Sequence, residues 1–487
     1  MGKRITIDPI TRLEGHGKID IFLDEKGNVE QAYFQVPEYR GFEKFCEGRA
    51  AEEMPALTQK ICGVCPTAHH AAASKALDDL FQVEPPAAAK KIRELMYNAF
   101  MFEDHILHFY ILAGPDFIVG PKAPKSERNI LGVINKVGIE VGKRVIDIRN
   151  RVRGINATIS ASSLYPVCGL PGGISKPLTE QERESIKVVA KDAVEFAKFT
   201  LQVFDDIVLK NKEYLDLISG DLYYHRTYYM GLVDEDNKVN FYDGKVRVVD
   251  PEGREFVKFA GRDYHRHLEE IPVPWSYLRI LYLKNIGWKG FVDGKESGIY
   301  RVAPLARLNA AEGMATAQAQ AEYERMFATL GGKPAHNTLA YHWARLIEVL
   351  YAAERMNELA VDPEITDPKV RQIPTAAPRE GVGVVEAPRG TLFHHYKTDE
   401  RGLLEKVNLL VGTQNNAAAI CMSVEKAARG LIKKGHVDEG LLNMIEMAFR
   451  AYDPCLACAT HSLPGQMPMR VNIYDGQRRL LRTISRD

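Results

Sequence analysis

The chain has 487 residues and a formal net charge of zero, because 64 lysines and arginines balance 64 aspartates and glutamates. This balance indicates neither a nucleic-acid-binding surface nor a polybasic membrane patch. No apolar run is long enough for a membrane span, and the N-terminus enters a strand-like pattern without a signal peptide. Seven cysteines, an odd number in a long chain, argue against a disulfide scaffold. We therefore expect a globular cytoplasmic protein with no membrane span and no nucleic-acid partner, and its neutral surface suits a multi-subunit complex.

The first part of the chain predicts a small sheet over residues 4–36. Residues 18–23 alternate in polarity and, after a turn, residues 29–36 return along them. A polar, glycine-bearing stretch over residues 11–17 precedes this hairpin and contains Glu14. Taken alone, Glu14 is best interpreted as an ordinary surface carboxylate.

Helical periodicity dominates the rest of the chain. The predicted helices cover residues 50–81, 86–112, 127–158, 180–217, 308–330, 337–360, 415–434 and 438–450. Thr179 and Glu182 form a capping-box pattern at the start of one of them. The helix over residues 86–112 carries four titratable side chains, those of Glu103, Asp104, His105 and His108. Such groups need partners if the helix is buried, and otherwise form one solvated stripe.

Two β regions interrupt the helices. Residues 222–260 predict an inserted lobe, a β-meander with strands over residues 239–242, 245–249 and 255–259. Residues 382–411 predict a hairpin that turns at residues 399–402. The predicted fold class is therefore α+β and mainly α. It has a core of long bundled helices with small peripheral β-sheets, in a single large domain over residues 1–487 that carries the inserted lobe.

Two cysteine pairs lie almost a full chain apart, Cys62 with Cys65 and Cys455 with Cys458. Two intervening residues let both sulfurs of a pair turn toward one point, which suits a metal. Four thiolates make a soft site for zinc, an iron–sulfur cluster or a nickel–iron centre. A zinc ribbon separates its pairs by only about 15–20 residues, so a shared site here would join the two ends of the fold. A redox-active CxxC motif explains one pair but not two.

The surroundings of the first pair favour thiolates. Pro66 suits the first turn of a helix, which places Cys62 and Cys65 at the positive end of the helix dipole. His69 follows Cys65 by four residues and lies on the same helix face. A packed core residue and a partner of a metal-bound thiolate are about equally good interpretations of His69. The remaining cysteines stand alone and are interpreted as core residues: Cys46, Cys168 and Cys421.

Five motifs together resemble one known family. In chain order they are Thr11-Arg12-Leu13-Glu14-Gly15-His16, Arg40-Gly41-Phe42-Glu43-Lys44-Phe45, Ile61-Cys62-Gly63-Val64-Cys65, Glu386-Ala387-Pro388-Arg389-Gly390 and Asp453-Pro454-Cys455-Leu456-Ala457-Cys458-Ala459-Thr460-His461. In this order they resemble the large, catalytic subunit of nickel–iron hydrogenases. Residues 383–396 look most like the cytoplasmic, bidirectional, NAD-linked branch of that family.

The resemblance implies the fold of that subunit, together with a nickel–iron centre whose iron carries carbon monoxide and two cyanides. Cys62 and Cys455 would be terminal ligands of nickel, and Cys65 and Cys458 would bridge nickel and iron. The implied reaction is the reversible heterolytic cleavage of dihydrogen. In it the metals polarise the substrate and a nearby base takes the proton.

The resemblance also gives roles to polar residues around the centre. Glu14 matches the family's proton-relay glutamate, and Arg389 matches an arginine suspended over the open site. Asp104 and Asp453 match the carboxylates that hold this arginine. Because a guanidinium rarely loses its proton, charge stabilisation is favoured for Arg389, with a base role as the alternative.

Three further residues match positions close to the metals. Pro388 and Thr413 would lie beside the cyanides, with Thr413 donating a hydrogen bond. His69 would contact a bridging thiolate.

Glu43 and His461 match side-chain ligands of a magnesium or similar ion, with the carbonyl of Leu409 as a third ligand. Family members are commonly made with a C-terminal extension, which a maturation endopeptidase removes after the histidine corresponding to His461. Residues 462–487 would be that extension. An uncut extension would put full metal loading in doubt.

Electrons from dihydrogen would leave through another subunit. The three cysteines outside the pairs cannot supply the four ligands that an iron–sulfur cluster needs. The resemblance implies a small iron–sulfur subunit, and beyond it a flavin module that reduces NAD(P), or ferredoxin. No GxGxxG motif opens a βαβ unit, so this chain is not expected to bind NAD itself.

Two other functions stay open as alternatives. One is a structural zinc-binding scaffold, in which a four-cysteine site only ties the termini together. The other is a non-hydrogenase homologue, such as the quinone-site subunit of respiratory complex I, but those subunits lack the cysteine pairs. A closed zinc site does not need Glu14, Asp104 or Arg389, and metal content would discriminate it.

Overall fold

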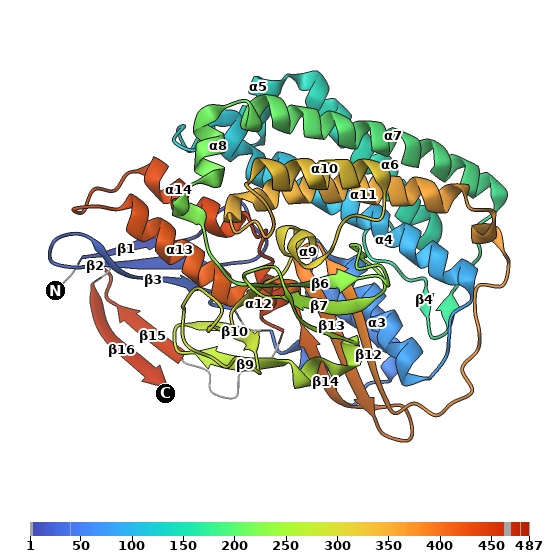
Figure 1. Ribbon diagram of the computed structural model, residues 1–487. Coiled ribbons are helices and arrows are strands. Elements are labelled where there is room, and N and C mark those ends of the chain that lie inside the picture. The colour runs from blue at the N-terminus through green and yellow to red at the C-terminus, as the bar shows by residue number, and fades with distance from the viewer. Residues whose placement is uncertain (1–2, 39, 462–468, 478, 487) are drawn as a thin grey trace.

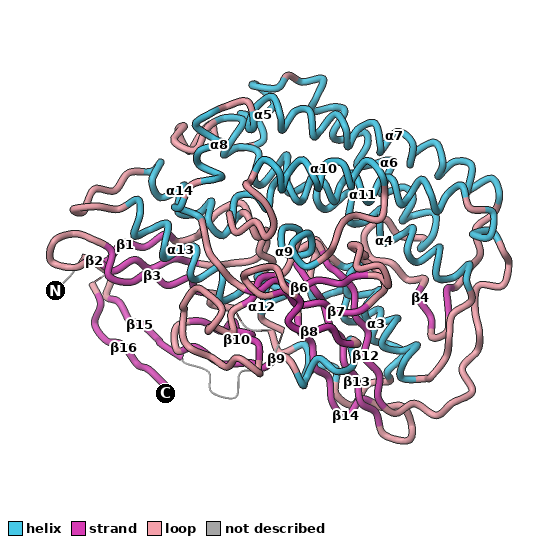
Figure 2. The backbone as a smooth tube through the Cα atoms, in the orientation of Figure 1, coloured by secondary structure: helices cyan, strands magenta, loops and turns pink. Residues whose placement is uncertain are grey.

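The computed structural model describes residues 3–38, 40–461, 469–477 and 479–486. Long helices pack side by side in one layer, and small sheets lie on the other side of the molecule (Figure 1). Figure 2 shows that loops and short helices join these two parts. The predicted class, mainly α with small sheets, is confirmed. No helix among the described residues combines the length and the apolar character that crossing a bilayer requires.

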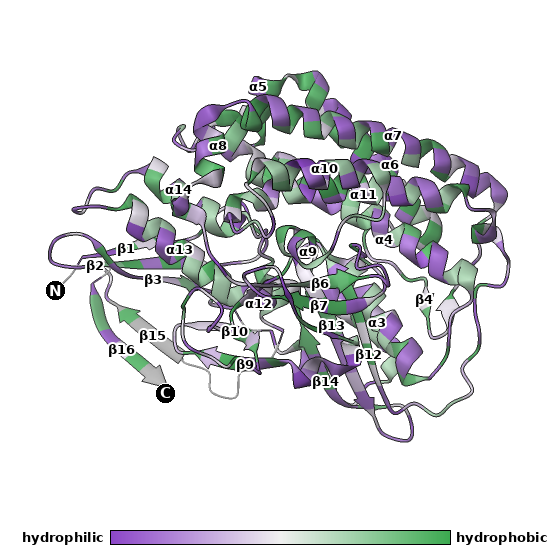
Figure 3. Ribbon diagram, in the orientation of Figure 1, coloured by the Kyte–Doolittle hydropathy of each residue, from purple (hydrophilic) through white to green (hydrophobic). Residues whose placement is uncertain are grey.

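Four long helices form the centre of the helical layer. They are α4 (Ala87–Leu107), α6 (Ile139–Ser160), α7 (Glu180–Phe204) and α11 (Tyr341–Val361). Helix α11 packs against α4 and α7, and α6 packs against the same two helices. Because α11 is buried on nearly all sides, it is the core of this layer. Helix α7 is instead amphipathic, with polar and apolar residues interspersed along it (Figure 3).

The other helices are shorter than these four. They are α1 (Phe42–Cys46), α2 (Met54–Thr58), α3 (Pro66–Leu80), α5 (Ile130–Val137), α8 (Lys212–Ser219), α9 (Pro304–Ala310), α10 (Ala317–Thr329), α12 (Gly412–Asn415), α13 (Ala417–Leu431), α14 (Glu439–Arg450) and α15 (Leu456–Ala459). Several predicted helices are divided in two. Gly138, with a φ of 92°, separates α5 from α6, and Asn211 caps α8 after a break that follows α7. The predicted capping box of Thr179 and Glu182 is confirmed.

Tighter and wider helical turns extend several of these helices. The π-helical segments are His108–Ala113, Pro115–Val119 and Asp205–Leu209. The 3-10 segments are Ala51–Glu53, Gln59–Ile61, Asp221–Tyr223, Gly261–Arg266, Thr338–Ala340 and Pro363–Thr366. The first two π segments continue α4, so the predicted helix over residues 86–112 is real but changes its winding at His108.

The predicted N-terminal sheet is confirmed. Strands β1 (Arg4–Ile7), β2 (Lys18–Leu23) and β3 (Val29–Gln35) form an antiparallel sheet in that order. Helix α13 packs against β3, so the first and last parts of the chain are neighbours.

The predicted meander exists, but its first strand is wrong. Strands β6 (Tyr228–Val233), β7 (Lys245–Val249) and β8 (Glu255–Phe259) form a sheet with β11 (Tyr300–Arg301) in the order β11-β6-β7-β8. Val239, in the strand predicted over residues 239–242, makes only an isolated bridge to Val233. All six residues of β6 are buried, so the polarity alternation that marks a half-exposed strand is absent there. Two small sheets complete the middle of the chain: β9 (Leu268–Val273) with β10 (Ser276–Leu283), and β4 (Gly169–Leu170) with β5 (Gly173–Ile174).

The predicted hairpin over residues 382–411 is a three-stranded sheet with two turns. Its strands are β12 (Glu380–Ala387), β13 (Gly390–Thr398) and β14 (Leu404–Leu410). The turn that was not predicted pairs Ala387 with Gly390 and therefore projects Pro388 and Arg389.

Close packing of α3 on β12 brings this turn to the first cysteine pair. A Cβ atom on Gly381 or Gly383 would lie 2.3 or 2.0 Å from backbone oxygens of α3. Only glycine permits this approach, which sets α3 and the turn of Arg389 in one place.

The chain ends in an antiparallel hairpin of β15 (Met469–Tyr474) and β16 (Leu480–Arg486). The strand predicted over residues 469–474 is confirmed. The first seven residues of the predicted C-terminal extension, 462–468, lie outside the described residues.

Candidate metal centre

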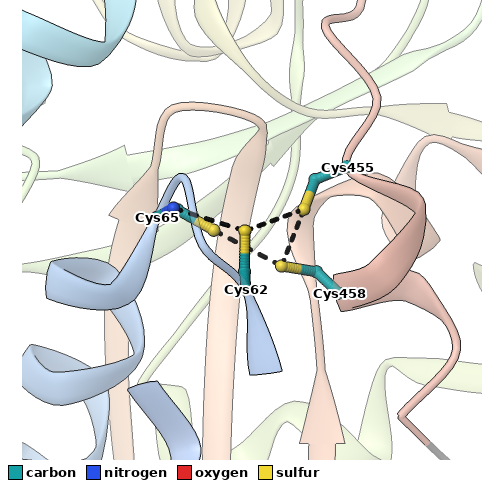
Figure 4. Close-up of side chains that lie close together, drawn as sticks. All are labelled: Cys62, Cys65, Cys455 and Cys458. Carbon is teal, nitrogen blue, oxygen red and sulfur yellow. Dashed lines mark hydrogen bonds between the residues drawn. The ribbon is translucent and has the colours of Figure 1, made fainter. Parts of the chain in front are cut away.

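The two cysteine pairs meet in the interior, as Figure 4 shows. The four Sγ atoms all lie within 4.8 Å of one another. Cys62 lies 3.2 Å from Cys455, Cys65 lies 3.3 Å from Cys458, and the two C-terminal sulfurs are 2.9 Å apart. All four are buried and free, since a disulfide needs a sulfur–sulfur distance of about 2.05 Å. The predicted joining of the two ends of the fold is confirmed.

Local backbone structure holds the first pair at the start of α3. Cys65 is the N-cap residue and Pro66 begins the helix, as predicted. The amides of Val64 and Cys65 donate to Cys62 Sγ at 3.2 and 3.3 Å. Backbone donors and the helix dipole both favour a negative sulfur here.

The second pair lies on the short helix α15, whose N-cap is Cys455. The backbone of Glu14 runs parallel to this loop in an isolated bridge to Cys455. The amide of Leu456 donates to Glu14 O at 2.9 Å. The N-terminal loop thus becomes part of the wall around the sulfurs.

The four sulfurs cannot all be thiolates unless cations lie beside them. Thiol donation from Cys455, Cys458 and Cys65 holds the pKa of Cys62 well below its ordinary value. Burial raises the pKa of both Cys455 and Cys458 well above theirs. Several negative sulfurs in one dry site need compensating cations. A set of four soft donors therefore fits soft or borderline transition metals.

Glu14 contacts this cluster directly. Its Oε2 atom accepts hydrogen bonds from Cys455 Sγ at 2.9 Å and from the amide of Ala457 at 3.1 Å. Burial raises the pKa of Glu14, and the charge on Cys62 raises it further. The carboxyl group is therefore prepared to hold a proton next to a sulfur. The interpretation of Glu14 as an ordinary surface carboxylate is wrong.

Arg389 extends over the same cluster from the turn between β12 and β13. Its two Nη atoms each lie 3.1 Å from an oxygen of Asp104, and Nη2 lies 3.0 Å from Asp453 Oδ2. Burial alone would lower the pKa of Arg389, but the two carboxylates raise it well above its ordinary value. Burial raises the pKa of Asp453 to about 7. The predicted clamp of two carboxylates on one guanidinium is present.

A small buried cavity separates Arg389 from the sulfurs. The residues that line it are Cys65, Ala68, His69, Ala387, Arg389, Leu392, Val411, Gly412, Thr413, Cys455 and Cys458. Thr413 Oγ1 accepts a hydrogen bond from the amide of Cys455 at 2.9 Å, and in the described part of the chain its hydroxyl hydrogen has no acceptor. Pro388 is buried between two lining residues but is not itself in the lining.

His69 lies beside the cluster and has a partner that the sequence analysis missed. Its Nε2 atom is 3.4 Å from Cys458 Sγ, and its Nδ1 atom is 3.1 Å from His394 Nε2. His394 Nδ1 is in turn 2.5 Å from the hydroxyl of Tyr396. Strand periodicity could have placed His394 and Tyr396 on one face of β13, but not next to His69.

The predicted magnesium ligands also come together. The amide of Leu409 donates to Glu43 Oε1 at 2.7 Å, and Leu409 O lies 2.6 Å from His461 Nε2. His461 Nε2 and Glu43 Oε1 are 3.5 Å apart. The other ring nitrogen of His461 is 2.8 Å from the carbonyl of Cys458, so this group lies directly behind the cysteine cluster. Burial raises the pKa of Glu43.

A buried ionic network supports the turn of Arg389 and was not predicted. Arg307 on α9 donates to Glu348 at 2.6 Å, to Glu386 at 2.7 Å and to the carbonyl of Ala387 at 2.9 Å. His105 Nε2 lies 2.9 Å from Glu348. The predicted need for partners along the helix of residues 86–112 is thus met. The partners come from α6 for Glu103, the turn of Arg389 for Asp104, α11 for His105 and the end of α14 for His108.

A second network, also not predicted, anchors the loop of Glu14. Asp116 accepts from Arg12 at 2.5 Å and from Arg450 at 2.6 Å. Arg450 also donates to Glu446 at 2.7 Å, and Glu446 accepts from the hydroxyl of Thr11 at 2.8 Å. These bonds tie the N-terminal loop to α14, which leads into the second cysteine pair.

Sequence comparison identifies the family. A family model described as nickel-dependent hydrogenase matches residues 40–157 and 295–461, and one described as HoxL-like matches residues 4–39. The chain belongs to the nickel-dependent hydrogenase family. It corresponds to the large, catalytic subunit of these oxidoreductases, as the resemblance of its motifs predicted. The match also argues against the quinone-site alternative.

Individual hydrogenases match along nearly the whole chain. An iron-sulfur subunit of the F420-non-reducing hydrogenase of Archaeoglobus profundus is 49% identical over 483 residues, 99% of each chain. The NAD-reducing hydrogenase HoxS subunit beta of Cupriavidus necator is 36% identical over 496 aligned residues, again 99% of each chain. The chain therefore resembles an F420-non-reducing hydrogenase, at 49% identity, as well as an NAD-reducing one, at 36% identity.

Solved structures confirm the fold. An NAD+-reducing [NiFe]-hydrogenase in the H2-reduced state superposes with a TM-score of 0.88 at 37% identity, covering 94% of this chain and 99% of that chain. The Ni-Fe-Se hydrogenase from D. vulgaris Hildenborough superposes with a TM-score of 0.74 at 23% identity, covering 95% and 100%. The second likeness shows the shared fold alone.

Proposed function

We propose that this hydrogenase subunit holds a nickel–iron centre between its two cysteine pairs, where it cleaves and forms dihydrogen reversibly. The observation that carries the proposal is the cluster of four buried, free thiols, three of which line one cavity with Arg389. A structural zinc site would be closed and would not need a buried cation opposite it. The bound metals would supply Lewis-acid polarisation of dihydrogen.

In this proposal each cysteine has a distinct place. Cys62 and Cys455 would hold nickel alone, and Cys65 and Cys458 would hold both nickel and an iron with carbon monoxide and two cyanides. Glu14 takes up and releases the proton at Oε2. Its 2.9 Å contact with Cys455 and its raised pKa support this role, since a relay group must accept a proton near neutral pH.

Arg389 acts by charge rather than as a base. Asp104 and Asp453 hold its planar fork on both sides and stabilise its protonated form. A positive group fixed over the cavity favours negative charge that develops there during the reaction. Thr413, whose hydroxyl hydrogen is free among the described residues, would donate to one cyanide, and Pro388 would lie beside the other.

Glu43, His461 and the carbonyl of Leu409 would hold a magnesium or similar ion. The support is a conflict in hydrogen bonding around His461. Both of its ring nitrogens face carbonyl oxygens, those of Cys458 and Leu409, but a neutral imidazole can donate through only one nitrogen. A cation held by His461 Nε2 and Leu409 O would remove the conflict, and carboxylate and carbonyl oxygens suit magnesium.

Electrons leave through a small iron–sulfur subunit. The cysteines outside the cluster are buried, and burial raises the pKa of Cys46 and Cys168 to about 11 and of Cys421 to about 12. Inert thiols of this kind do not build a second cluster in this chain. The relative named NAD-reducing supports NAD(P) as the acceptor, reached through a flavin subunit, and ferredoxin is the alternative acceptor.

Maturation removes residues 462–487 by endopeptidase cleavage after His461, in the cytoplasm. In the described part of this tail, β15 and β16 pair with each other and join no other sheet, and Leu480 and Leu481 are 55% and 65% exposed. His461 itself is fully buried against the proposed magnesium site, so cleavage there couples to completion of the centre.

An infrared spectrum of the purified protein, combined with metal analysis, tests the proposal. Bands from one carbonyl and two cyanides, with nickel and iron each near one per chain, are the expected result. Zinc at one per chain with no such bands, in protein that lacks the tail, would show instead a structural four-cysteine zinc site.

A further inference from the structure

A line of hydrogen-bonded side chains leads away from the cysteine cluster on the side of α3. It starts at Cys458 and continues through His69 and His394 to Tyr396, with contacts of 3.4, 3.1 and 2.5 Å. His394 and Tyr396 are fully buried, and His69 is 1% exposed. We call His69, His394 and Tyr396 the histidine–tyrosine chain.

When Cys458 binds a metal, only one assignment of donors and acceptors fits the histidine–tyrosine chain. A metal-bound thiolate has no hydrogen, so His69 Nε2 must donate to it. Two ring nitrogens that both carry hydrogen could not share the 3.1 Å contact between His69 and His394, and a neutral imidazole carries one ring hydrogen. His69 Nδ1 must then accept from His394 Nε2. His394 Nδ1 must in turn accept from the hydroxyl of Tyr396.

We infer that His394 and Tyr396 are positioning residues that fix the tautomer of His69, so that its Nε2–H donates to the thiolate of Cys458. The inference rests on the proposed function, because it needs Cys458 to be a metal ligand. A second shell of this kind tunes a metal site through the charge left on the sulfur. With the hydrogen bond in place, the sulfur gives less electron density to the metals.

The histidine–tyrosine chain positions His69 and does not conduct protons to the surface. Tyr396 also contacts Thr58. The hydroxyl of Thr58 donates to the carbonyl of Met54 at 2.7 Å. Thr58 and Met54 are both fully buried. The line therefore ends inside the protein, where no proton can be exchanged with solvent.

Strand β13 itself supplies a matched control. His395 follows His394 but points to the opposite face of the sheet, as strand alternation requires. It contacts the hydroxyl of Tyr264 at 2.9 Å and Glu380 at 2.8 Å, and its side chain is 21% exposed. A substitution at His395 perturbs the same strand without touching the histidine–tyrosine chain.

The test uses the complete, metal-loaded complex and records the carbonyl and cyanide infrared bands and the midpoint potential of the centre. In Tyr396→Phe the hydroxyl donor is lost, so His394 and His69 can adopt the other tautomers. The carbonyl band is expected to shift to lower wavenumber and the midpoint potential to fall, because the sulfur then donates more electron density. His394→Leu should produce the same shifts. His394→Gln, which can still donate and accept, should restore the wild-type values, and His395→Gln should leave them unchanged.

The outcomes separate the inference from the function on which it rests. Carbonyl bands that stay in place in both Tyr396→Phe and His394→Leu would overturn the inference and leave the nickel–iron centre intact. Bands that move equally in His395→Gln would also overturn it, because the effect would then belong to the strand. Absence of the bands from the wild-type complex would refute the proposed function and the inference together.

Discussion

Glu14 and Cys455, from opposite ends of the sequence, are joined at two levels. The carboxylate Oε2 of Glu14 accepts from Cys455 Sγ at 2.9 Å, and the backbones of the two residues form a parallel bridge. The backbone bridge therefore keeps the side chain of Glu14 close to Cys455. A proton released at the metal site meets a carboxyl group that is already fixed against a proposed nickel ligand.

Replacement of Glu14 by glutamine should therefore slow proton movement without disturbing the centre. Glutamine keeps an oxygen for the amide of Ala457 but cannot carry a proton, and loss of a positioned acid–base group costs on the order of 100-fold or more in rate. Hydrogen–deuterium exchange with dihydrogen should fall by this amount while the infrared bands stay in place. Glu38→Gln, which alters a carboxylate near the surface, is the control. An exchange rate equal to that of the wild type would remove Glu14 from the relay.

The four cysteines of the cluster should be needed to retain the metals, whereas the cysteines outside it should not. Cys65→Ser replaces a soft thiolate by a hydroxyl that binds nickel and iron poorly, so nickel, iron and activity should all be lost. Cys421→Ser, at a buried cysteine outside the cluster, should keep both metals. Elemental analysis of the two purified variants measures the difference. Full metal content in Cys65→Ser would contradict the assignment of the cluster.

Which parts of this site could be predicted depends on how local the signal is. The cysteine spacing and the helix start at Pro66 are local patterns, and both were predicted correctly. The Arg307 network was not predictable, because its partners Glu348 and Glu386 come from α11 and β12 and no spacing along the chain links them. All three side chains are buried in the folded protein, and this burial, which the sequence does not reveal, is what requires them to pair.

The same distinction explains the errors in the fold. Strand β6 was missed because it is buried on both faces and therefore lacks alternation. The turn at Pro388 and Arg389 was missed because the residues on both sides of it are apolar enough to read as one strand. Glycines at positions 381 and 383 carried a signal for close packing, but the partner, α3, lies some three hundred residues earlier in the sequence.

Lysine at position 389 should preserve the metals and lose most of the turnover. The arginine fork reaches Asp104 and Asp453 at once, whereas an ammonium group is a single point charge that cannot span both. A loss on the order of 100-fold or more in H2 oxidation is expected when a preorganised donor is lost from a site. The infrared bands and the nickel and iron contents should persist. Wild-type turnover in Arg389→Lys would contradict the assigned role, and Arg379→Lys, at an exposed arginine, controls for the exchange itself.

Removal of Arg307 should destabilise the whole fold. Arg307→Met leaves Glu348 and Glu386 buried without a counter-charge, which typically costs about 3–5 kcal/mol of unfolding free energy. Denaturant unfolding of the metal-free chain measures this cost. Arg401→Met, which breaks an exposed pair with Asp399, should change stability by less than about 1 kcal/mol. Equal effects of the two variants would show that the buried network contributes no more than a surface pair.

Stability should fall as the pH drops below about 6.5, and His70 is one measurable source of this fall. Burial lowers the pKa of His70 to about 4. Its Nδ1 donates to Pro55 O at 3.2 Å and its Nε2 accepts from the amide of Gly169 at 2.9 Å, so a second proton has no place. Between about pH 6.5 and 4 the unfolded chain binds this proton and the folded chain does not, so the unfolding free energy decreases by about 1.4 kcal/mol for each pH unit lost.

His70→Gln keeps a donor and an acceptor but cannot titrate, and its melting temperature should depend less steeply on pH over this range. Ser74→Ala, which removes a neighbouring hydroxyl that donates to His70 O, should lower the melting temperature equally at every pH. A slope in His70→Gln as steep as that of the wild type would assign the acid sensitivity to other groups.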